Sequence, residues 1–224
     1  MTSFSLEIQI DQAGLQSIST AGMSVALLQP QSMANYQIVA LLPASTGTIY
    51  VTWTDAISVY TSSYSLQAYG TLQINSHVPA LSGQKFTFDG TFITPSGTTS
   101  LPQTIQLTNA SGASITSGVA TTFQVNQQSQ GLAITTASSL LNNGQGSFQI
   151  SNQVMLTLLG GAQVGMALPT QVFPGSQTKF SPFISFYQVT VQRPLTLDFS
   201  AATPSQTVHF DDQASMFVVG SLPH

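Results

Sequence analysis

Apolar and polar residues alternate with a period of two along most of this chain. Phe4, Leu6 and Ile8 alternate with Ser5 and Glu7, which is the pattern of a strand with one buried face. The same alternation returns in six later segments: Ile49 to Trp53, Ile105 to Leu107, Phe123 to Val125, Phe148 to Ile150, Phe183 to Val191, and Leu195 to Phe199. The pattern therefore predicts a protein built mainly of strands.

Two departures from strict alternation are informative. Asp11 precedes Leu15 and Ile18 at the spacing of an N-cap before one apolar helix face, which predicts a short helix. The runs Met23 to Leu28 and Tyr36 to Leu42 are continuously apolar, and each has the length of a strand. Continuous apolar strands are typical of sheets that are buried on both faces.

Turn signals recur about every 8 to 15 residues, and no long segment has a helical period. Asp89-Gly90 lies between aromatic strands and predicts a hairpin, whereas Leu132 to Leu141 is compatible with either a short helix or a strand. We therefore expect an all-β fold: an antiparallel β-sandwich, jelly-roll-like or an open barrel, with at most one or two short helices. Residues 1–224 are expected to form a single domain, with one weak candidate boundary near residues 95–102.

The charge content is far below that of an ordinary domain. Only 4% of residues are charged, against about one in four in typical soluble domains. The stretch from Gly90 to Thr178 contains no Asp, Glu, Lys, Arg or His. Because 42% of residues are hydrophobic and the mean hydropathy is +0.22, the chain can still build a core and does not resemble a disordered one.

This composition excludes several classes of function. The three basic residues, Lys85, Lys179 and Arg193, cannot neutralise a nucleic-acid backbone or hold an anionic membrane, so no nucleic-acid partner is expected. Cysteine is absent, which removes disulfides, thiolate catalysis and Cys-ligated metals. No phosphate loop, dinucleotide fingerprint or nucleophile elbow occurs, so we expect no cofactor and no enzymatic activity.

No Sec-type signal and no apolar run long enough for a transmembrane helix are apparent. The compartment stays unassigned. The alternatives are a cytoplasmic protein, a protein assembled in a particle, or one exported by a non-classical route. Asn109-Ala-Ser111 fits the acceptor pattern for N-glycosylation, although such triplets are common.

Two groups of residues are candidates for a binding site. Trp53, Tyr60 and Tyr64 would stack on sugar rings while Asp55 accepts hydrogen bonds from sugar hydroxyls, and core packing of Trp53 is the competing interpretation. On a strand, His209 and Asp211 project from the same face, as two metal ligands must. A third ligand would have to come from His77 or His224, and a solvent-facing turn is the alternative interpretation.

The uncharged middle is a candidate for contact with other surfaces. Its uncharged Ser, Thr, Asn and Gln residues lack the charged gatekeepers that keep strand edges apart, which favours self-association. Uncharged amphipathic hairpins also cross a bilayer most readily, so a β-pore with an insertion segment within residues 104–159 is the rival hypothesis. The apolar residues expected to take part in either contact are Ile105, Leu107, Phe123, Val125, Phe148 and Ile150.

From these observations we expect a non-enzymatic protein that acts through an uncharged Ser/Thr/Asn/Gln-rich surface. It would be either a self-assembling structural protein or a binder of neutral surface ligands such as glycans. A pore-forming or membrane-damaging toxin is the alternative. The expected partners are further copies of the chain in a homo-oligomer or larger assembly, with glycans or a membrane surface as the other candidates.

Overall fold

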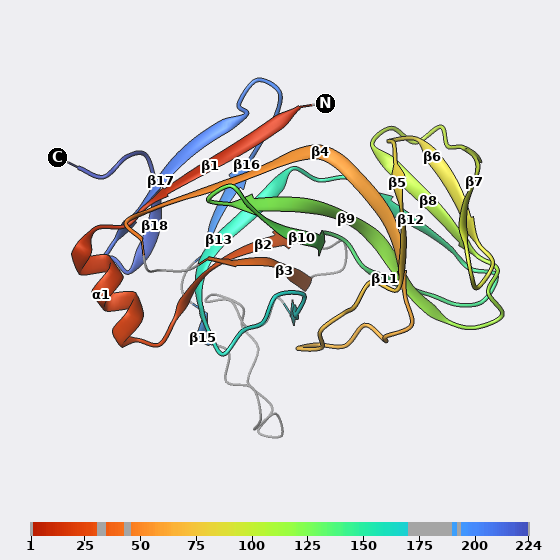
Figure 1. Ribbon diagram of the computed structural model, residues 1–224, viewed down its shortest axis with the longest axis horizontal. Helices are drawn as coiled ribbons and strands as arrows, with labels where there is room; N and C mark the ends of the chain where they lie inside the picture. Colours follow the sequence, from red (N-terminus) through yellow and green to blue (C-terminus); the bar gives the residue numbers. More distant parts are fainter. Residues whose placement is uncertain (1, 31–34, 43–45, 170–189, 192–193, 224) are drawn as a thin grey trace.

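The computed structural model describes residues 2–30, 35–42, 46–169, 190–191 and 194–223. These residues form three β-sheets and one helix, α1 (Gln12–Thr20) (Figure 1). Most strand pairs are antiparallel, the exceptions being β1 with β17 and β6 with β8, and no sheet in this part of the chain closes into a barrel. The predicted all-β sandwich is confirmed, and so is the short helix.

The largest sheet, which we call the long sheet, has eight strands. Its main path runs β10-β9-β4-β1-β17-β18, with β5 paired to β4 and β11 paired to β9. The strands are β1 (Ser3–Gln9), β4 (Thr48–Ser62), β5 (Ser76–Ala80), β9 (Ile115–Val125), β10 (Gln128–Ile134), β11 (Ser138–Leu140), β17 (Ser205–Asp211) and β18 (Met216–Val219). The segment that fitted either a helix or a strand, Leu132 to Leu141, therefore contributes to β10 and β11.

Two smaller sheets complete the fold. The six-stranded sheet has the order β14-β3-β2-β13-β15, with β16 also paired to β13. Its strands are β2 (Ser24–Pro30), β3 (Asn35–Leu42), β13 (Gln153–Gly160), β14 (Ala167–Pro169), β15 (Thr190–Val191) and β16 (Leu195–Asp198). The four-stranded sheet has the order β12-β8-β6-β7, from β6 (Gln84–Phe88), β7 (Ile93–Thr98), β8 (Thr104–Asn109) and β12 (Gln145–Gln149). Apart from Thr190 and Val191, the predicted strand from Phe183 to Val191 lies outside the described residues.

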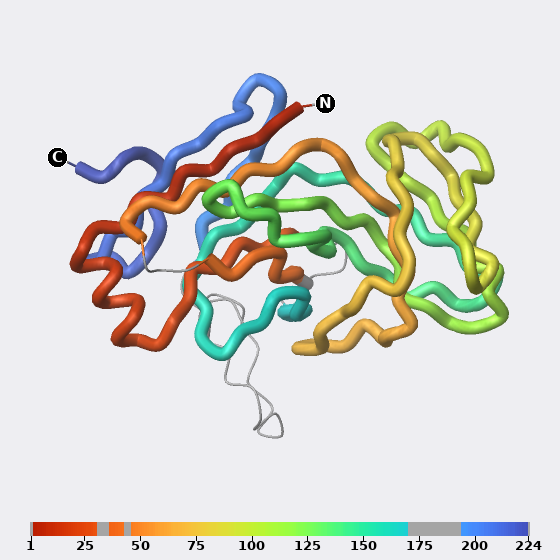
Figure 2. The backbone as a smooth tube through the Cα atoms, viewed as in Figure 1, coloured from red at the N-terminus to blue at the C-terminus, as the bar shows by residue number. Residues whose placement is uncertain are grey.

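The molecule has two lobes, and the paired strands β4 and β9 run from one lobe to the other (Figures 1 and 2). The six-stranded sheet covers one end of the long sheet, which we call the first lobe, and the four-stranded sheet covers the other end, the second lobe. Phe123 and Val125 of β9 face the first core, and Val119 faces the second. Because alternate residues of one strand share a face, both smaller sheets lie on the same side of the long sheet.

Each lobe has its own hydrophobic core. In the first lobe, Leu6 and Ile8 of β1 pack against Val25 and Leu27 of β2, all with no exposed surface. The opposite face of the six-stranded sheet is also buried, around a cluster that includes Leu28 and residues of β3 and β14. The two continuous apolar runs in the sequence are therefore strands buried on both faces, as predicted.

The register of β4 changes where the lobes meet. Trp53 pairs with Phe123 but Ile57 pairs with Thr121, so β4 contains two more residues than β9 across this interval. The hydroxyl of Thr121 donates to the carbonyl oxygens of Ala56 (2.7 Å) and Thr54 (3.4 Å), which ties the bulge to the neighbouring strand. Bulges bend a strand and aim side chains in new directions. Here the bulge presents Asp55 and Ala56 between the lobes.

The loops behave as the turn signals predict. Asp89-Gly90 forms the hairpin between β6 and β7, where the Asp89 carboxylate accepts backbone amides of Thr91 and Phe92, both at 2.8 Å. The candidate boundary at residues 95–102 runs from β7 into the turn before β8, inside the four-stranded sheet. No helix in the described part of the chain is long and apolar enough to cross a membrane.

Candidate functional site

The predicted aromatic platform for sugars is not assembled on the surface, because two of its three rings are buried. Trp53 is 5% exposed and lies among Phe4, Phe123 and Phe199, with ring centroids 5.7, 5.4 and 4.8 Å away. The competing interpretation, core packing of Trp53, describes its position. The prediction that a sugar stacks on the Trp53 ring is therefore wrong, because the surrounding aromatic rings leave Trp53 without an open face.

Tyr60 faces the opposite side of the long sheet from Trp53. It has no exposed surface, and its hydroxyl donates to the carbonyl oxygen of Thr136 at 2.9 Å. Burial raises the pKa of the Tyr60 phenol. Tyr64 is 46% exposed but lies beyond the end of β4. Of the four predicted glycan-contacting residues, Asp55 and Tyr64 are exposed, while Tyr60 is corrected to a core residue.

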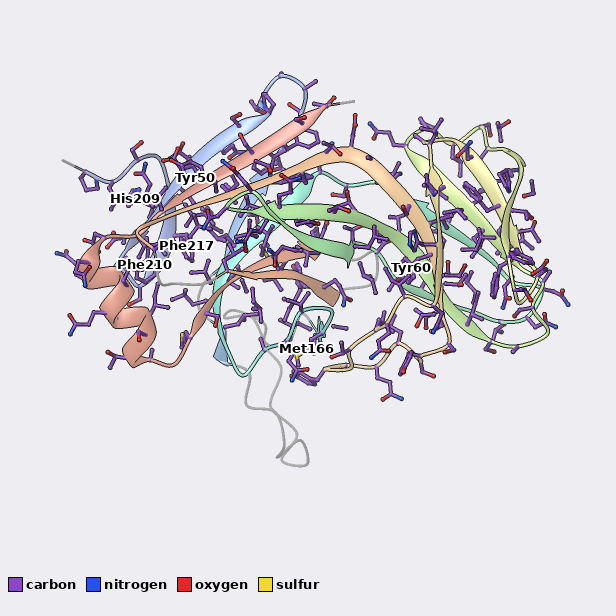
Figure 3. The ribbon with its side chains drawn as sticks, in the orientation of Figure 1. Tyr50, Tyr60, Met166, His209, Phe210 and Phe217 are labelled. Atoms are coloured by element: carbon purple, nitrogen blue, oxygen red, sulfur yellow. The ribbon has the colours of Figure 1, made fainter. Side chains whose placement is uncertain are left out.

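His209 and Asp211 do project from the same face of β17, and each is held by the backbone nearby. His209 Nδ1 lies 3.0 Å from the carbonyl oxygen of Gly220, and Asp211 Oδ1 accepts the amide of Ala214 at 3.0 Å. Figure 3 places His209 at the other end of the molecule from Tyr60, the cross-strand partner of His77. Among the described residues, no three His, Cys, Asp or Glu side chains gather as a metal site, and His224 lies outside them.

The six apolar residues assigned to self-association or membrane contact lie inside the protein. Phe123 and Val125 belong to the core of the first lobe. The other four, Ile105, Leu107, Phe148 and the partly buried Ile150, belong to the core of the second lobe or pack against it. These side chains are therefore corrected from surface to core positions, because each strand turns its apolar face to the opposite sheet. The polar residues that alternate with them face outward.

The largest hollow among the described pockets is a cleft between the two lobes, with a volume of about 980 Å³. We call it the interlobe cleft. Its walls come from the β4 bulge, the turn after β5, the β12–β13 connection, and the ends of β1 and β16. The residues that line it are Thr2, Phe4, Asp55, Ala56, Ile57, Pro79, Ala80, Leu81, Ser82, Gln103, Ile150, Ser151, Asn152, Gln153, Asp198, Phe199, Ser200 and Ala201. No lysine or arginine of the described chain lines it.

Two carboxylates line this cleft: Asp55 from the β4 bulge and Asp198 from the end of β16. Asp55 Oδ2 accepts the backbone amide of Thr2 at 2.9 Å, and the Asp55 amide donates to the Thr2 carbonyl at 3.0 Å. Asp198 Oδ1 accepts the side-chain amide of Gln153 at 2.7 Å. One oxygen of each carboxylate therefore holds the wall of the cleft together. Within the described residues, the other oxygen has no intramolecular donor.

The β12–β13 connection forms one wall of the cleft and is itself fixed. Ile150 donates its amide to the carbonyl of Gln103 at 2.9 Å, and the carbonyl of Asn152 accepts the amide of Phe199 at 3.3 Å. The backbone is thereby tied to both lobes. The Asn152 side chain, by contrast, has no hydrogen-bonding partner in the described part of the chain, so its amide group can meet a ligand.

Next to the cleft lies a small, partly open hollow of about 20 Å³, large enough for one water-sized group. It is bounded by Trp53 and by Gln29 of β2, and it shares Asp55 and Asn152 with the interlobe cleft. Gln29 is 5% exposed, and its Nε2 donates to the Ser151 carbonyl at 2.7 Å. Its Oε1 atom is buried without a partner among the described residues. A buried acceptor without a donor costs folding free energy, so a hydroxyl or water that donates to Gln29 Oε1 would be favourable.

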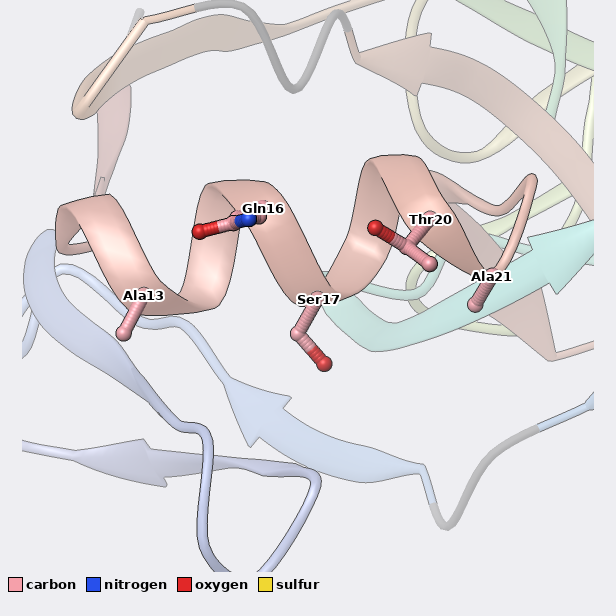
Figure 4. Close-up of a pocket in the computed structure, with 5 residues that line it drawn as sticks. All are labelled: Ala13, Gln16, Ser17, Thr20 and Ala21. Atoms are coloured by element: carbon pink, nitrogen blue, oxygen red, sulfur yellow. The ribbon is translucent and has the colours of Figure 1, made fainter.

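Two other hollows are poorer candidates. The exposed side of α1 borders a hollow of about 450 Å³ lined by Ala13, Gln16, Ser17, Thr20 and Ala21 (Figure 4). Short side chains on one helix face offer no convergent polar groups. The residues that line a third hollow, of about 340 Å³, are mostly apolar, and His77 is one of them. Among the hollows formed by the described residues, the interlobe cleft is the one that combines size, polar groups from several elements and an orphaned acceptor in an adjoining hollow.

The candidate residues chosen from the sequence include Asp55 and Ile150 of the cleft lining, each for a different role, but not Asp198 or Asn152. Asp198 and Asn152 are far from Asp55 in sequence and lie in no motif, so only the pairing of distant strands brings them together. The available signal was weak: Asn152 follows a predicted strand, and Asp198 lies within one, near its end. Comparison with protein-family models, curated proteins and solved structures finds no match. The class of this protein is thus given by its fold alone, a two-lobed β-sandwich with a bent shared sheet.

Proposed function

We propose that this chain is a non-enzymatic recognition protein that binds a neutral, hydroxyl-rich ligand, of the kind found in glycans, in the interlobe cleft. The observation that carries this proposal is the cleft itself, with its uncompensated acceptors and no cation among its described lining residues. A volume of about 980 Å³ is at the upper end of the usual range for small-molecule sites.

The chemistry of the lining selects for neutral ligands. Hydroxyl groups donate to the free oxygens of Asp55 and Asp198 and pair with the amide of Asn152. Anionic sugars and phosphates are disfavoured, because both ionisable groups in the cleft are acids and no described lining residue supplies a counter-charge. Pro79 and Leu81, together with Ile57, give an apolar wall for the C–H face of a sugar ring.

The small hollow lined by Gln29 also favours a hydroxyl-bearing ligand. Gln29 lines this hollow, and a ligand hydroxyl there would donate to the orphaned Oε1 once the Gln29 amide turns that buried atom toward it. This contact would distinguish ligands with a protruding hydroxyl from those without one. Removing a single such hydrogen bond costs about 1 kcal/mol, which is roughly five-fold in affinity.

The test is binding of soluble neutral oligosaccharides, first on a glycan array and then by calorimetry with the strongest ligand. Ala201→Trp places a bulky ring at the exposed rim of the cleft and is expected to abolish binding. Ala13→Trp makes the same substitution on the exposed face of α1, so it is the matched control and is expected to bind normally. Asn152→Ala is expected to weaken binding roughly five-fold.

Two results would overturn the proposal. One is no binding of any neutral glycan at millimolar concentration by the folded protein. The other is binding that Ala201→Trp and Asn152→Ala both leave unchanged, because the ligand would then occupy another surface.

A further inference from the structure

Most strands at the sheet edges carry a feature that hinders pairing with another molecule. Such features include proline, a bulge, a charge, or a length of only a few residues. In the described part of the chain, β5 contains Pro79, β7 contains Pro95 and a register shift, β10 has a register shift beside Gly131, and β11 and β14 have three residues each. β12, Gln145–Gln149, has none of these: its sequence is QGSFQ and its pairing with β8 is regular over five residues.

The hydrogen-bond pattern shows which groups of β12 point outward. The Asn109 amide donates to the Gly144 carbonyl, and the Ile150 amide donates to the Gln103 carbonyl, both at 2.9 Å. In an antiparallel ladder the bonded residues alternate, so Gly146 and Phe148 bond to β8 in the same way. The backbone amides and carbonyls of Gln145, Ser147 and Gln149 therefore face the open edge, where no described residue pairs with them.

The side chains of this edge are complementary to themselves. Gln145, Ser147 and Gln149 are exposed, whereas Gly146 and Phe148 are buried. If two β12 strands pair antiparallel about Ser147, Gln145 meets Gln149 of the second copy and the two Ser147 residues meet each other. Phe148 then lies opposite Gly146 of the second copy, the one residue without a side chain. Amide and hydroxyl pairs line the outer face, and no charge is placed in the contact.

We propose that β12 is a homodimerisation edge: two copies of the chain pair antiparallel through Gln145–Gln149 about a twofold axis at Ser147. Their four-stranded sheets become one continuous sheet across the dimer. The self-complementary order of residues, together with the outward backbone groups, argues for a second copy over an unrelated strand.

Electrostatics do not oppose this pairing. The one described basic residue, Lys85, lies on β6, two strands inward from β12. Across the axis, the two copies of Lys85 are separated by five strand spacings of about 4.8 Å, or roughly 24 Å. That distance is well beyond the Debye length of about 8 Å at physiological salt. The contact is small, so we expect a concentration-dependent dimer rather than an obligate one.

The absence of cysteine from the chain gives a direct test. Opposed residues of a hydrogen-bonded antiparallel pair have Cα atoms about 5.5 Å apart, a spacing that a disulfide spans. Ser147→Cys is therefore expected to form a covalent dimer under mild oxidation, at a rate that rises with dimer population. Thr94→Cys, an exposed position on the opposite edge of the same sheet, is the matched control and is expected to cross-link much more slowly.

A charge pair provides an independent second measurement by analytical ultracentrifugation. Ser147→Lys and Ser147→Glu each place like charges together at the axis, so each variant alone is expected to be monomeric. An equimolar mixture of the two variants is expected to dimerise again, because the introduced ammonium of one copy would meet the introduced carboxylate of the other. Circular dichroism confirms that each variant is folded.

The proposal fails if wild-type protein stays monomeric up to about millimolar concentration, or if it dimerises but Ser147→Lys and Ser147→Glu dimerise equally well. It also fails if Ser147→Cys cross-links no faster than Thr94→Cys. The inference does not depend on ligand binding in the interlobe cleft, so either can fail without the other.

Discussion

Asn109, at the end of β8, is a buried side chain whose removal should destabilise the second lobe. It has no exposed surface. Its Nδ2 donates to the carbonyl oxygens of Ala113, Leu141 and Leu140 at 2.7, 3.1 and 3.2 Å, and its Oδ1 accepts the amide and the hydroxyl of Ser111 at 3.1 and 2.7 Å. One amide group thus joins the end of β8 to the loop that follows it and to a second loop, at Leu140 and Leu141, that is more than 30 residues away in sequence.

Asn109→Ala removes these bonds and leaves carbonyl groups without a donor. Each lost bond is worth about 1 kcal/mol, and each buried polar group left unpaired costs about 1 to 3 kcal/mol. Because the loops can relax toward water, we expect a total loss of about 3 to 4 kcal/mol in the free energy of unfolding. That is a large share of the roughly 5 to 15 kcal/mol typical of a domain. Asn142→Ala, which removes one exposed bond to the Gly112 amide, is the control and should cost less than about 1 kcal/mol.

Urea unfolding at pH 7, followed by far-UV circular dichroism, measures the change. Fluorescence of Trp53, the single tryptophan, reports the first lobe at the same time. The two signals should coincide, because β4 and β9 run through both lobes. A loss below about 1 kcal/mol for Asn109→Ala would refute the reasoning.

Asn109→Asp gives a second, pH-dependent check. An ionised carboxylate at this position faces carbonyl oxygens in a buried site, which raises the pKa of the introduced group above its unfolded value. The neutral acid retains one donor. This variant should therefore be relatively most stable below about pH 4 and lose stability as the pH rises through the folded pKa. A stability difference from wild type that does not change with pH would contradict this account.

Two further changes test single hydrogen-bonded groups. Tyr60→Phe leaves the Thr136 carbonyl unpaired and should cost about 1 kcal/mol of unfolding free energy at pH 7. Because burial raises the Tyr60 pKa, wild-type protein should also lose stability as the pH rises above about 10. Tyr60→Phe should reduce this decline in alkaline melting curves. Asp89→Ala removes the acceptor for two hairpin amides, which lower the pKa of Asp89, so it should reduce the melting temperature at pH 7. The Asp89 carboxylate stabilises the fold above its unfolded pKa and stops doing so as the pH falls through its folded pKa. The difference in melting temperature between wild type and Asp89→Ala should therefore shrink below about pH 4. A constant difference from pH 7 to pH 2 would contradict the assignment.

The buried state of Asn109 also bears on its glycosylation triplet. Asn109-Ala-Ser111 fits the acceptor pattern, yet the Asn109 side-chain amide already donates to three carbonyl groups and has no exposed surface. A glycan on this nitrogen is incompatible with the folded chain. The sequence pattern identified the residues but carried no information about their burial.

Local sequence determined much of the secondary structure, because its signals act over a few residues. The alternation of Phe4, Leu6 and Ile8 predicts which side chains of β1 share a face. The Asp11 carboxylate accepts the Gly14 amide at 2.7 Å, and this cap begins α1 as the spacing predicts. The Asp89-Gly90 hairpin is equally local. Each of these features depends on backbone geometry within one turn or strand.

Periodicity specifies which residues share a face but not which surface covers that face. Trp53 and Tyr60 lie an odd number of residues apart on β4, so they point to opposite sides of the long sheet, and the two extra residues of the bulge preserve this alternation. The expectation that they form one platform was wrong because each side is covered by a different part of the chain. The same limit applies to Phe148 and Ile105, whose alternation was predicted and whose apolar face is covered by the opposite sheet.

The sequence by itself thus determined an all-β chain, its one described helix, and a surface almost free of charge. The tertiary structure alone decided where that surface is hollowed and where a strand edge is left open. The interlobe cleft depends on pairings between strands that are distant in sequence: β1 pairs with β4 beside the Thr2–Asp55 contact, and β13 pairs with β16, which sets Gln153 and the neighbouring Asn152 beside Asp198 and Phe199. Such pairings depend on the packing of the whole chain, so no local pattern encodes them.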